Sequence, residues 1–292
     1  MIVVRNPFHF CFLVFCVVFL FPTFAKSSVF YMVMNKFENK LTLHSFEDAS
    51  LLKEYRAITG SAVGDKEREG DLKTPEGIYF IERRVPQKKL FKLHGPAAVE
   101  LNYPNSVDRI FRRSGDGIWI HGVDNEDRMK KRFDTRGCIA LSNKDILDLV
   151  GRLTYQDIPI VIHEKNIEDV KIGLTPLNSP THRRVEEWAA AWSSKNLESY
   201  LSFYSSDFYS KGMNFDKWTS YKKRLNQKYQ SIKVSIEDLK ILRHGKYAVA
   251  VFRQKYRGDS YSVIGRKRLY LIGEGANALI LAEESIDDSV SN

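Results

Sequence analysis

Two residues of this chain have side chains that could act together in nucleophilic catalysis. His121 ends an apolar, strand-like run, Ile118-Trp119-Ile120, and Cys138 follows sixteen residues after Gly122. A thiolate is a strong nucleophile, and an imidazole can take up and return its proton. The pair predicts nucleophilic catalysis, with the cysteine as nucleophile and the histidine as base and later as acid. A lone cysteine and a lone histidine in a β-rich domain are also often core residues, so the pair by itself leaves a structural role open.

The residues around this pair suit the same chemistry. Gly137 permits an unusual φ and a close approach of substrate, and the amides of Gly137 and Cys138 are candidates for an oxyanion hole. The carbonyl of Gly122 is the nearest group that could orient the His121 ring. We expect Cys138 to lie at a turn entering a helix, because Ser142 is a good N-cap for the periodic stretch from 143 to 151. A helix N-terminus would stabilise the thiolate.

The cysteine count and the N-terminus point to export. Residues 10–21 are almost wholly apolar, Arg5 precedes them, and Pro22 and Ala25 follow. This layout predicts a secretory signal peptide at residues 1–25, with an uncleaved anchor as the alternative. Cys11 and Cys16 lie inside it, so the mature chain keeps Cys138 alone and cannot form an internal disulfide. We therefore expect an exported, periplasmic protein with a thiol that is either inert or retained for chemistry.

The charge narrows the choice of partners. The net charge is +9, but no run of five like charges and no nucleic-acid motif is present, so we expect no nucleic-acid partner. The basic balance suits peripheral contact with an anionic wall or membrane. His94, His121 and Cys138 lack the spacing of a metal site, so no metal and no cofactor is expected. The sequence leaves the oligomeric state open.

The chain divides into two domains that differ in predicted secondary structure. Residues 26–173 alternate short β-branched runs with Gly, Pro, Asn and Asp, which predicts a mostly-β domain. Residues 174–181 contain two prolines and form a linker. Residues 182–286 begin with apolar residues at helical spacing and continue as alternating strands, which predicts an α+β domain whose curved sheet wraps on helices. Residues 287–292 are a tail. The expected strands of the first domain are 29–33, 40–45, 77–82, 117–120 and 158–163; the second has expected helices at 185–193, 197–204 and 215–226 and strands at 232–236, 247–256, 260–272 and 278–284.

The motifs around Cys138 resemble those of a known family. His121-Gly122, the spacing, and Thr135-Arg136-Gly137-Cys138-Ile139 are similar to the signature of the L,D-transpeptidase catalytic domain. Thr74-Pro75-Glu76-Gly77-Ile78-Tyr79 and Leu101-Asn102-Tyr103-Pro104-Asn105 with Asp108 resemble two further segments of that domain. The resemblance implies a β-sandwich fold. It implies an enzyme that attacks the bond between meso-diaminopimelate and terminal D-alanine in peptidoglycan stems. It also implies Cys138 as nucleophile, His121 as base, Gly122 as the orienting carbonyl and Gly137 in the oxyanion hole.

One position departs from that family. Many transpeptidases have an arginine where this chain has Ala140, which puts the handling of a substrate carboxylate in doubt. Arg136 could supply a cation instead, and with Thr135 it is a candidate for substrate binding. The alternative for Arg136 is an exposed, solvated side chain.

The second domain resembles the nuclear-transport-factor-2-like (NTF2-like) fold. Trp188, Trp192, Tyr200 and Tyr204 carry this resemblance, with the strand around Ala248–Tyr256 and the terminal Glu283-Glu284. A transpeptidase-like domain followed by such a module is similar to the cell-shape-determining L,D-carboxypeptidases, which trim tetrapeptide stems to tripeptides by transfer to water. This implies a carboxypeptidase. The alternatives are a transpeptidase that forms 3–3 crosslinks or acts at wall-protein linkages, and a non-catalytic wall-binding protein.

Overall fold

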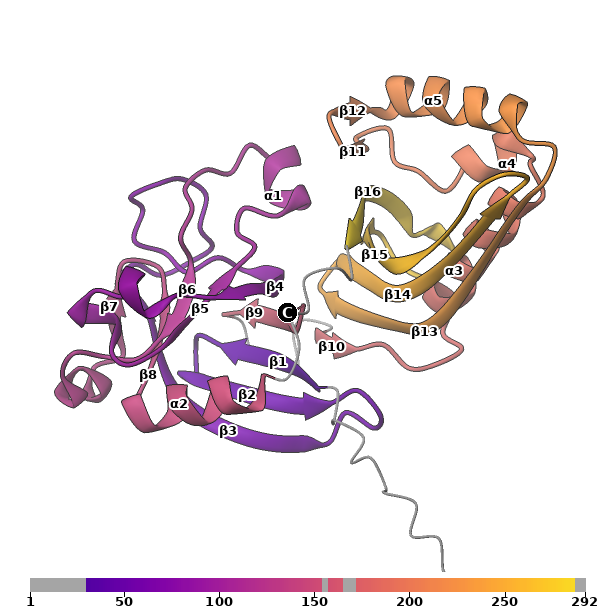
Figure 1. Ribbon diagram of the computed structural model, residues 1–292. Helices are drawn as coiled ribbons and strands as arrows, with labels where there is room; N and C mark the ends of the chain where they lie inside the picture. The colour runs from indigo at the N-terminus through magenta and orange to yellow at the C-terminus, as the bar shows by residue number, and fades with distance from the viewer. Residues whose placement is uncertain (1–29, 154–156, 165–171, 287–292) are drawn as a thin grey trace, which may run out of the picture.

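The computed structural model describes residues 30–153, 157–164 and 172–286. Within these ranges the chain forms a mostly-β first domain and an α+β second domain, as predicted (Figure 1). The predicted signal peptide at 1–25 and the tail at 287–292 lie outside the described residues. Among the described residues, no helix is both long and apolar enough to cross a membrane.

The first domain is built on one nine-stranded sheet. Its order is β2-β1-β9-β4-β5-β6-β8-β3-β7, and a further pairing of β2 with β3 closes the sheet on itself. Long β3 makes this closure possible because its first half pairs with β2 and its second half with β8. The strands are β1 (Phe30–Asn35), β2 (Lys40–Ser45), β3 (Leu51–Gly60), β4 (Gly77–Arg84), β5 (Ala98–Leu101), β6 (Trp119–His121), β7 (Phe133–Thr135), β8 (Ile139–Leu141) and β9 (Pro159–His163).

Short helices connect these strands and cover the sheet. α2 (Asn143–Arg152) begins at the predicted cap, where the Ser142 side chain accepts from the Asp145 amide. Its buried residues Ile146 and Leu149 pack into the first core, which contains alternate residues of β1 and β9. The other helices of this domain are α1 (Ser106–Ile110), η1 (Gln87–Lys89), η2 (Lys92–His94) and η3 (Glu126–Lys130).

The second domain places three helices against a five-stranded sheet of order β10-β13-β14-β15-β16. Strand β13 bulges between Glu237 and Lys240, where Asp238 has φ 55°, and this irregularity bends the long strand. Aromatic residues of the helices fill the concave side, among them Trp188, Tyr200 and Trp218. The elements are β10 (Ile172–Leu174), α3 (Pro180–Ser193), α4 (Leu197–Leu201), β11 (Tyr209–Ser210), β12 (Met213–Asn214), α5 (Phe215–Lys228), β13 (Ile232–His244), β14 (Tyr247–Gly258), β15 (Ser262–Ile272), η5 (Gly275–Asn277) and β16 (Leu279–Ile286).

The two domains share a third apolar cluster. Phe80 and Val161 of the first domain pack with Leu242, Val249 and Tyr270 of the second. Strand β10 belongs to the second sheet, because Ile172–Leu174 pairs antiparallel with the end of β13. The domain boundary predicted at residue 173 therefore lies inside a strand that joins the second domain.

A buried arginine reinforces this contact between the domains. Arg268 of β15 forms ion pairs with Asp157 of the first domain and, at 3.1 Å, with Glu284. Its guanidinium carbon also lies 3.6 Å from the centroid of the Phe80 ring. Asp157 is 6% exposed, so its carboxylate depends on arginine for compensation of its charge.

We expect Arg268→Met to destabilise the protein by about 3 kcal/mol, since it leaves the buried carboxylate of Asp157 with the more distant Arg266, at 3.5 Å. In thermal unfolding this corresponds to a fall in Tm of roughly 6–12 °C for a protein of this size. Arg253→Met, an exposed arginine on the neighbouring strand β14, is the control. Adding Asp157→Asn to Arg268→Met should restore part of the loss; equal Tm values for wild type and Arg268→Met would contradict this account of the interface.

Candidate catalytic site

The parallel pairing of β6 with β8 brings the two predicted catalytic residues together. Ile120 pairs with Ile139 and His121 with Ala140, so Cys138 precedes β8 next to the start of β6. The Trp119 amide donates to Cys138 Sγ at 3.5 Å, which places the sulfur against β6. Side chains two residues apart along a strand share a face, so His121 and Cys138 are diagonal neighbours across the two strands.

The His121 ring is held by the carbonyl of Gly122, as the sequence suggested. His121 Nδ1 lies 2.5 Å from that oxygen. A carbonyl can only accept, so Nδ1 carries the proton and the neutral ring keeps its lone pair on Nε2. Burial of the ring, which is 3% exposed, lowers the pKa of His121 to about 4. The imidazole is therefore neutral near pH 7, the form that a general base needs.

Gly122 must be a glycine because the chain is crowded there. A Cβ at this position would lie 2.5 Å from Asn143 Oδ1 and 2.9 Å from Pro96 Cδ. Asn143, the first residue of α2, uses the same Oδ1 to accept from the Val123 amide at 2.9 Å. The helix start thus fixes the loop that carries the orienting carbonyl.

Cys138 does not lie at a helix N-terminus, which corrects the sequence-based prediction. The apolar residues Ile139–Leu141 form strand β8, all fully buried, and α2 begins only after Ser142. Burial raises the pKa of the Cys138 thiol, although the Trp119 amide and the charge of Lys66 oppose this. The structure therefore favours a neutral thiol, which donates to the Gly117 carbonyl at 3.5 Å, and a neutral imidazole on the neighbouring strand β6.

The turn before Cys138 is fixed by two threonines. Gly137 has φ +125°, and a Cβ there would lie 2.8 Å from the Lys73 carbonyl oxygen. Thr74 Oγ1 donates to the Gly137 carbonyl at 2.9 Å and accepts from the Gly60 amide at 2.9 Å. Thr135 Oγ1 donates to the Cys138 carbonyl at 2.6 Å and accepts from the Gly137 amide at 3.2 Å.

These bonds bear on two roles expected from the sequence. Thr135 is 4% exposed and both of its hydroxyl bonds go to the turn, so it supports the turn from inside. The Gly137 amide is engaged by Thr135, which leaves the Cys138 amide as the better placed of the two expected oxyanion donors. Arg136 is exposed two residues before the cysteine.

The position of Ala140 is closed to a larger side chain. Ala140 is fully buried and packs in a small cluster with Ile58, Val123 and Met129. An arginine could not occupy this space without displacing the segment that carries Met129. The packing above β8 therefore accounts for an alanine at position 140 where many transpeptidases have an arginine.

Sequence reasoning missed two rings beside the catalytic pair. The His94 ring lies 4.9 Å from the His121 ring, edge-on at 75°, and also 4.9 Å from the Trp119 ring. His94 Nδ1 and Trp119 Nε1 are buried and have no hydrogen-bond partner among the described residues. Only the strand register reveals these neighbours, because His94 is far from the motif in sequence.

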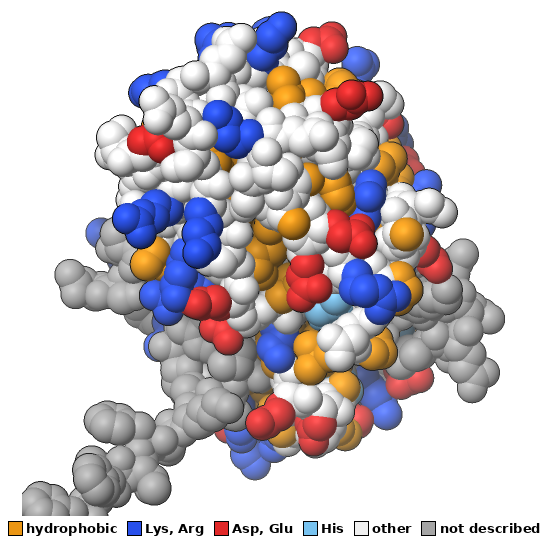
Figure 2. All heavy atoms as spheres, turned by 90° about the vertical axis from the view of Figure 1, so that its right-hand side faces the viewer, with side chains coloured by type: hydrophobic (Ala, Val, Ile, Leu, Met, Phe, Trp, Pro, Cys, Tyr) orange, Lys and Arg blue, Asp and Glu red, His pale blue; other side chains and the backbone are white. Residues whose placement is uncertain are grey.

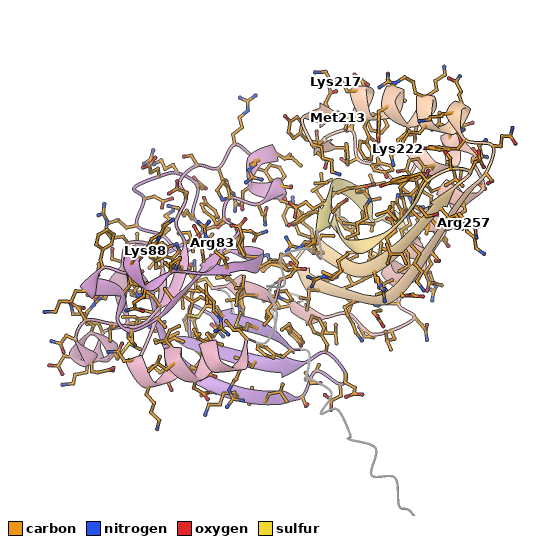
Figure 3. All side chains as sticks on the ribbon, viewed as in Figure 1. Arg83, Lys88, Met213, Lys217, Lys222 and Arg257 are labelled. Carbon is orange, nitrogen blue, oxygen red and sulfur yellow. The ribbon has the colours of Figure 1, made fainter. Side chains whose placement is uncertain are left out.

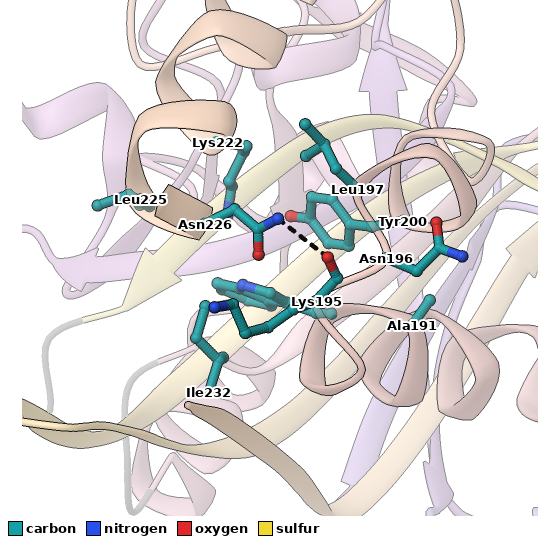
Figure 4. Close-up of a pocket in the computed structure, with 10 residues that line it drawn as sticks. Ala191, Lys195, Asn196, Leu197, Tyr200, Lys222, Leu225, Asn226 and Ile232 are labelled. Atoms are coloured by element: carbon teal, nitrogen blue, oxygen red, sulfur yellow. Dashed lines mark hydrogen bonds between the residues drawn. The ribbon is translucent and has the colours of Figure 1, made fainter. Parts of the chain in front are cut away.

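The second domain has its own pocket, bordered by α3, α4 and α5 (Figure 4). The Lys222 ammonium lies 3.7 Å from the Trp192 ring centroid, 4.5 Å from that of Trp218 and 5.2 Å from that of Tyr200. Burial lowers the pKa of Lys222 to about 7, and the buried Glu283 opposes this shift. Figure 3 shows Lys222 beneath α5, whereas Lys217 lies on its outer side.

The outer surface of this domain carries dispersed charge. In Figure 2, lysine and arginine side chains gather mainly along the upper and left edges, with acidic side chains and exposed apolar side chains between them. This face has no continuous basic track of the kind that follows a nucleic-acid backbone.

Comparisons with known proteins agree with both domains. Residues 30–162 match the L,D-transpeptidase catalytic domain, and residues 181–284 match the Cds6 C-terminal NTF2-like domain. The L,D-transpeptidase homologue YafK of Escherichia coli strain K12 is 32% identical over 111 residues, which span 37% of this chain and only 39% of that relative.

Two solved structures resemble nearly the whole chain. The helical cell shape determining protein Pgp2 from Campylobacter jejuni is 29% identical with a TM-score of 0.71, covering 88% of this chain and 94% of that one. Bd1075 from Bdellovibrio bacteriovorus is 29% identical with a TM-score of 0.72, covering 90% of this chain and 94% of that one.

We expect Thr74→Val to impair the turn, because it removes the bonds to both Gly137 and Gly60 at nearly constant volume. The loss of two buried hydrogen bonds should cost about 1–3 kcal/mol in chemical denaturation. Alkylation of Cys138 by iodoacetamide should change in rate as the turn relaxes. Thr74→Ser keeps the hydroxyl and is the control; if Thr74→Val matched wild type in both measurements, Thr74 would not support the turn.

Proposed function

We propose that this chain, whose two domains match the L,D-transpeptidase catalytic domain and the Cds6 C-terminal NTF2-like domain, is a peptidoglycan L,D-carboxypeptidase. Its substrate would be a tetrapeptide stem, and the cleaved bond would join meso-diaminopimelate to terminal D-alanine. The observation that carries the proposal is the neutral His121, whose Nδ1 is bonded to Gly122, on strand β6, which pairs with the strand that directly follows Cys138.

The reaction follows from this geometry in two halves. His121 Nε2 takes the thiol proton as Cys138 Sγ attacks the carbonyl carbon, and the Cys138 amide faces the developing oxyanion. The carbon–nitrogen bond breaks, the imidazolium returns the proton to the leaving amine of D-alanine, and a thioester remains. Water then attacks the thioester with His121 as base, and the products are the tripeptide carboxylate and the free thiol.

The choice of water as acceptor rests on the whole-chain likeness. Pgp2 and Bd1075 resemble this chain across both domains, whereas YafK matches only part of the first. The closed space above Ala140 supports the same choice, because this chain lacks the cation that many transpeptidases place there. Transpeptidation to form 3–3 crosslinks or to attach wall proteins is the alternative, since it shares the acylation half. A wall-binding protein without catalysis is the second alternative. An exported, periplasmic location follows from this substrate.

Cys138→Ala should reduce D-alanine release from purified tetrapeptide muropeptide by about 10³-fold or more, since no other nucleophile replaces the thiol. A circular dichroism spectrum equal to that of wild type would show that the fold is retained. Digestion of isolated sacculi by wild type should yield tripeptide stems. New 3–3 crosslinks would instead favour the transpeptidase, and undiminished release by Cys138→Ala would refute the nucleophile.

We also propose that the pocket around Lys222 binds the wall, as the aromatic rings and the buried cation suit a carboxylate-bearing stem or its sugar. Lys222→Met keeps the volume but removes the charge, and should weaken co-sedimentation with sacculi several-fold. Release of D-alanine from soluble muropeptide should stay unchanged. Lys217→Met, on the exposed side of the same helix, is the matched control, and equal binding by both variants would remove this role.

A further inference from the structure

Arg128 joins three segments that surround the catalytic pair. It lies on η3 between His121 and Cys138, with its side chain only 14% exposed. Its Nε donates to Asp134 Oδ2 at 2.6 Å, and its NH1 donates to Asp124 Oδ1 at 2.8 Å and to the Leu93 carbonyl at 3.2 Å. A planar guanidinium can hold three acceptors in fixed directions, which an ammonium cannot do with the same geometry.

Each of these acceptors stands next to a part of the site. Leu93 precedes His94, whose ring meets the His121 ring edge-on at 4.9 Å. Asp124 follows the loop that presents the Gly122 carbonyl to His121. Asp134 lies on β7, directly before the turn that carries Cys138. The Arg128 side chain therefore links the segment before His94, the loop that carries the Gly122 carbonyl and the turn before Cys138.

The same short helix explains the closed space at Ala140. Met129 packs over Ala140, and its neighbour Arg128 turns toward the loops around His121. The segment whose Met129 leaves no room for an arginine at position 140 thus carries Arg128, which approaches the loops around His121 from η3.

We propose that Arg128 is a positioning residue for His121, which holds His94 against the imidazole through Leu93 and fixes the Gly122 loop through Asp124. This inference rests on the proposed acyl-transfer function only for its effect on rate. The contacts themselves are independent of which acceptor the enzyme uses.

The charges around His121 predict the direction in which its pKa changes when Arg128 is replaced. The titratable and charged groups that act on the ring include His94, Arg128 and Asp124. After burial, His94 and Arg128 lower the pKa of His121, whereas the Gly122 bond and Asp124 raise it. Removing the Arg128 charge leaves the effect of Asp124 uncompensated, so the pKa of His121 must rise. More imidazolium at acidic pH means less base, and the acidic limb of the rate profile moves to higher pH.

The test combines a titration with kinetics. In a Cys138→Ala background, NMR titration of the His121 ring should show a higher pKa after Arg128→Gln and little change after Arg128→Lys. In the enzyme with its cysteine, Arg128→Gln should lower kcat for D-alanine release by about 10- to 100-fold, with a smaller effect on KM. Arg128→Lys should also lower kcat, because it keeps the charge but loses the three-way bridge. Lys130→Gln, an exposed cation on the same helix, is the control.

The outcomes separate this proposal from the proposed function. An Arg128→Gln variant with unchanged His121 pKa, unchanged pH profile and only a lower Tm would reduce Arg128 to a structural residue and overturn the proposal. If Arg128→Gln did not fold, an Arg128→Lys variant with the kcat of wild type would overturn it. If wild type released no D-alanine, the proposed function would fail, while the titration would still decide the role of Arg128.

Discussion

The parallel pairing of β6 with β8 is the constraint on which the proposed catalytic site depends. It places a histidine and a cysteine from separate stretches of the chain on adjacent strands, with the Trp119 amide directed at the sulfur. Both strands are short and lie in the middle of a sheet that closes on itself, so neither can shift without moving its neighbours. A shift of one residue would turn His121 to the opposite face. The catalytic geometry is therefore a property of the sheet as much as of the two side chains.

The contact between the domains has consequences for how the protein meets its substrate. Because Phe80, Val161 and Tyr270 share one apolar cluster, the second domain is packed on the catalytic domain and not merely tethered to it. A wall strand bound at the pocket near Lys222 would then be presented to the catalytic domain at a fixed spacing.

Much of this could be predicted from the sequence, and the misses have a common cause. The cap at Ser142 and the alternation in β2 depend on neighbouring residues, so local patterns found them. The orienting carbonyl of Gly122 was predicted because it is adjacent to His121. Strand β8 was missed because its three residues lie between a cysteine and a strong helix signal. The contributions of Thr74, His94 and Arg128 arise from contacts between distant segments, which no local pattern encodes.

The central claim is that Cys138 carries the acyl group while His121 moves the proton. It is tested most directly by peptide-mapping mass spectrometry of enzyme quenched in acid during turnover of a tetrapeptide muropeptide. The account predicts an adduct on Cys138 with the mass of the substrate less D-alanine, and its loss when His121 is replaced by alanine. D-Alanine release without any adduct on Cys138, or an adduct on another residue, would contradict it.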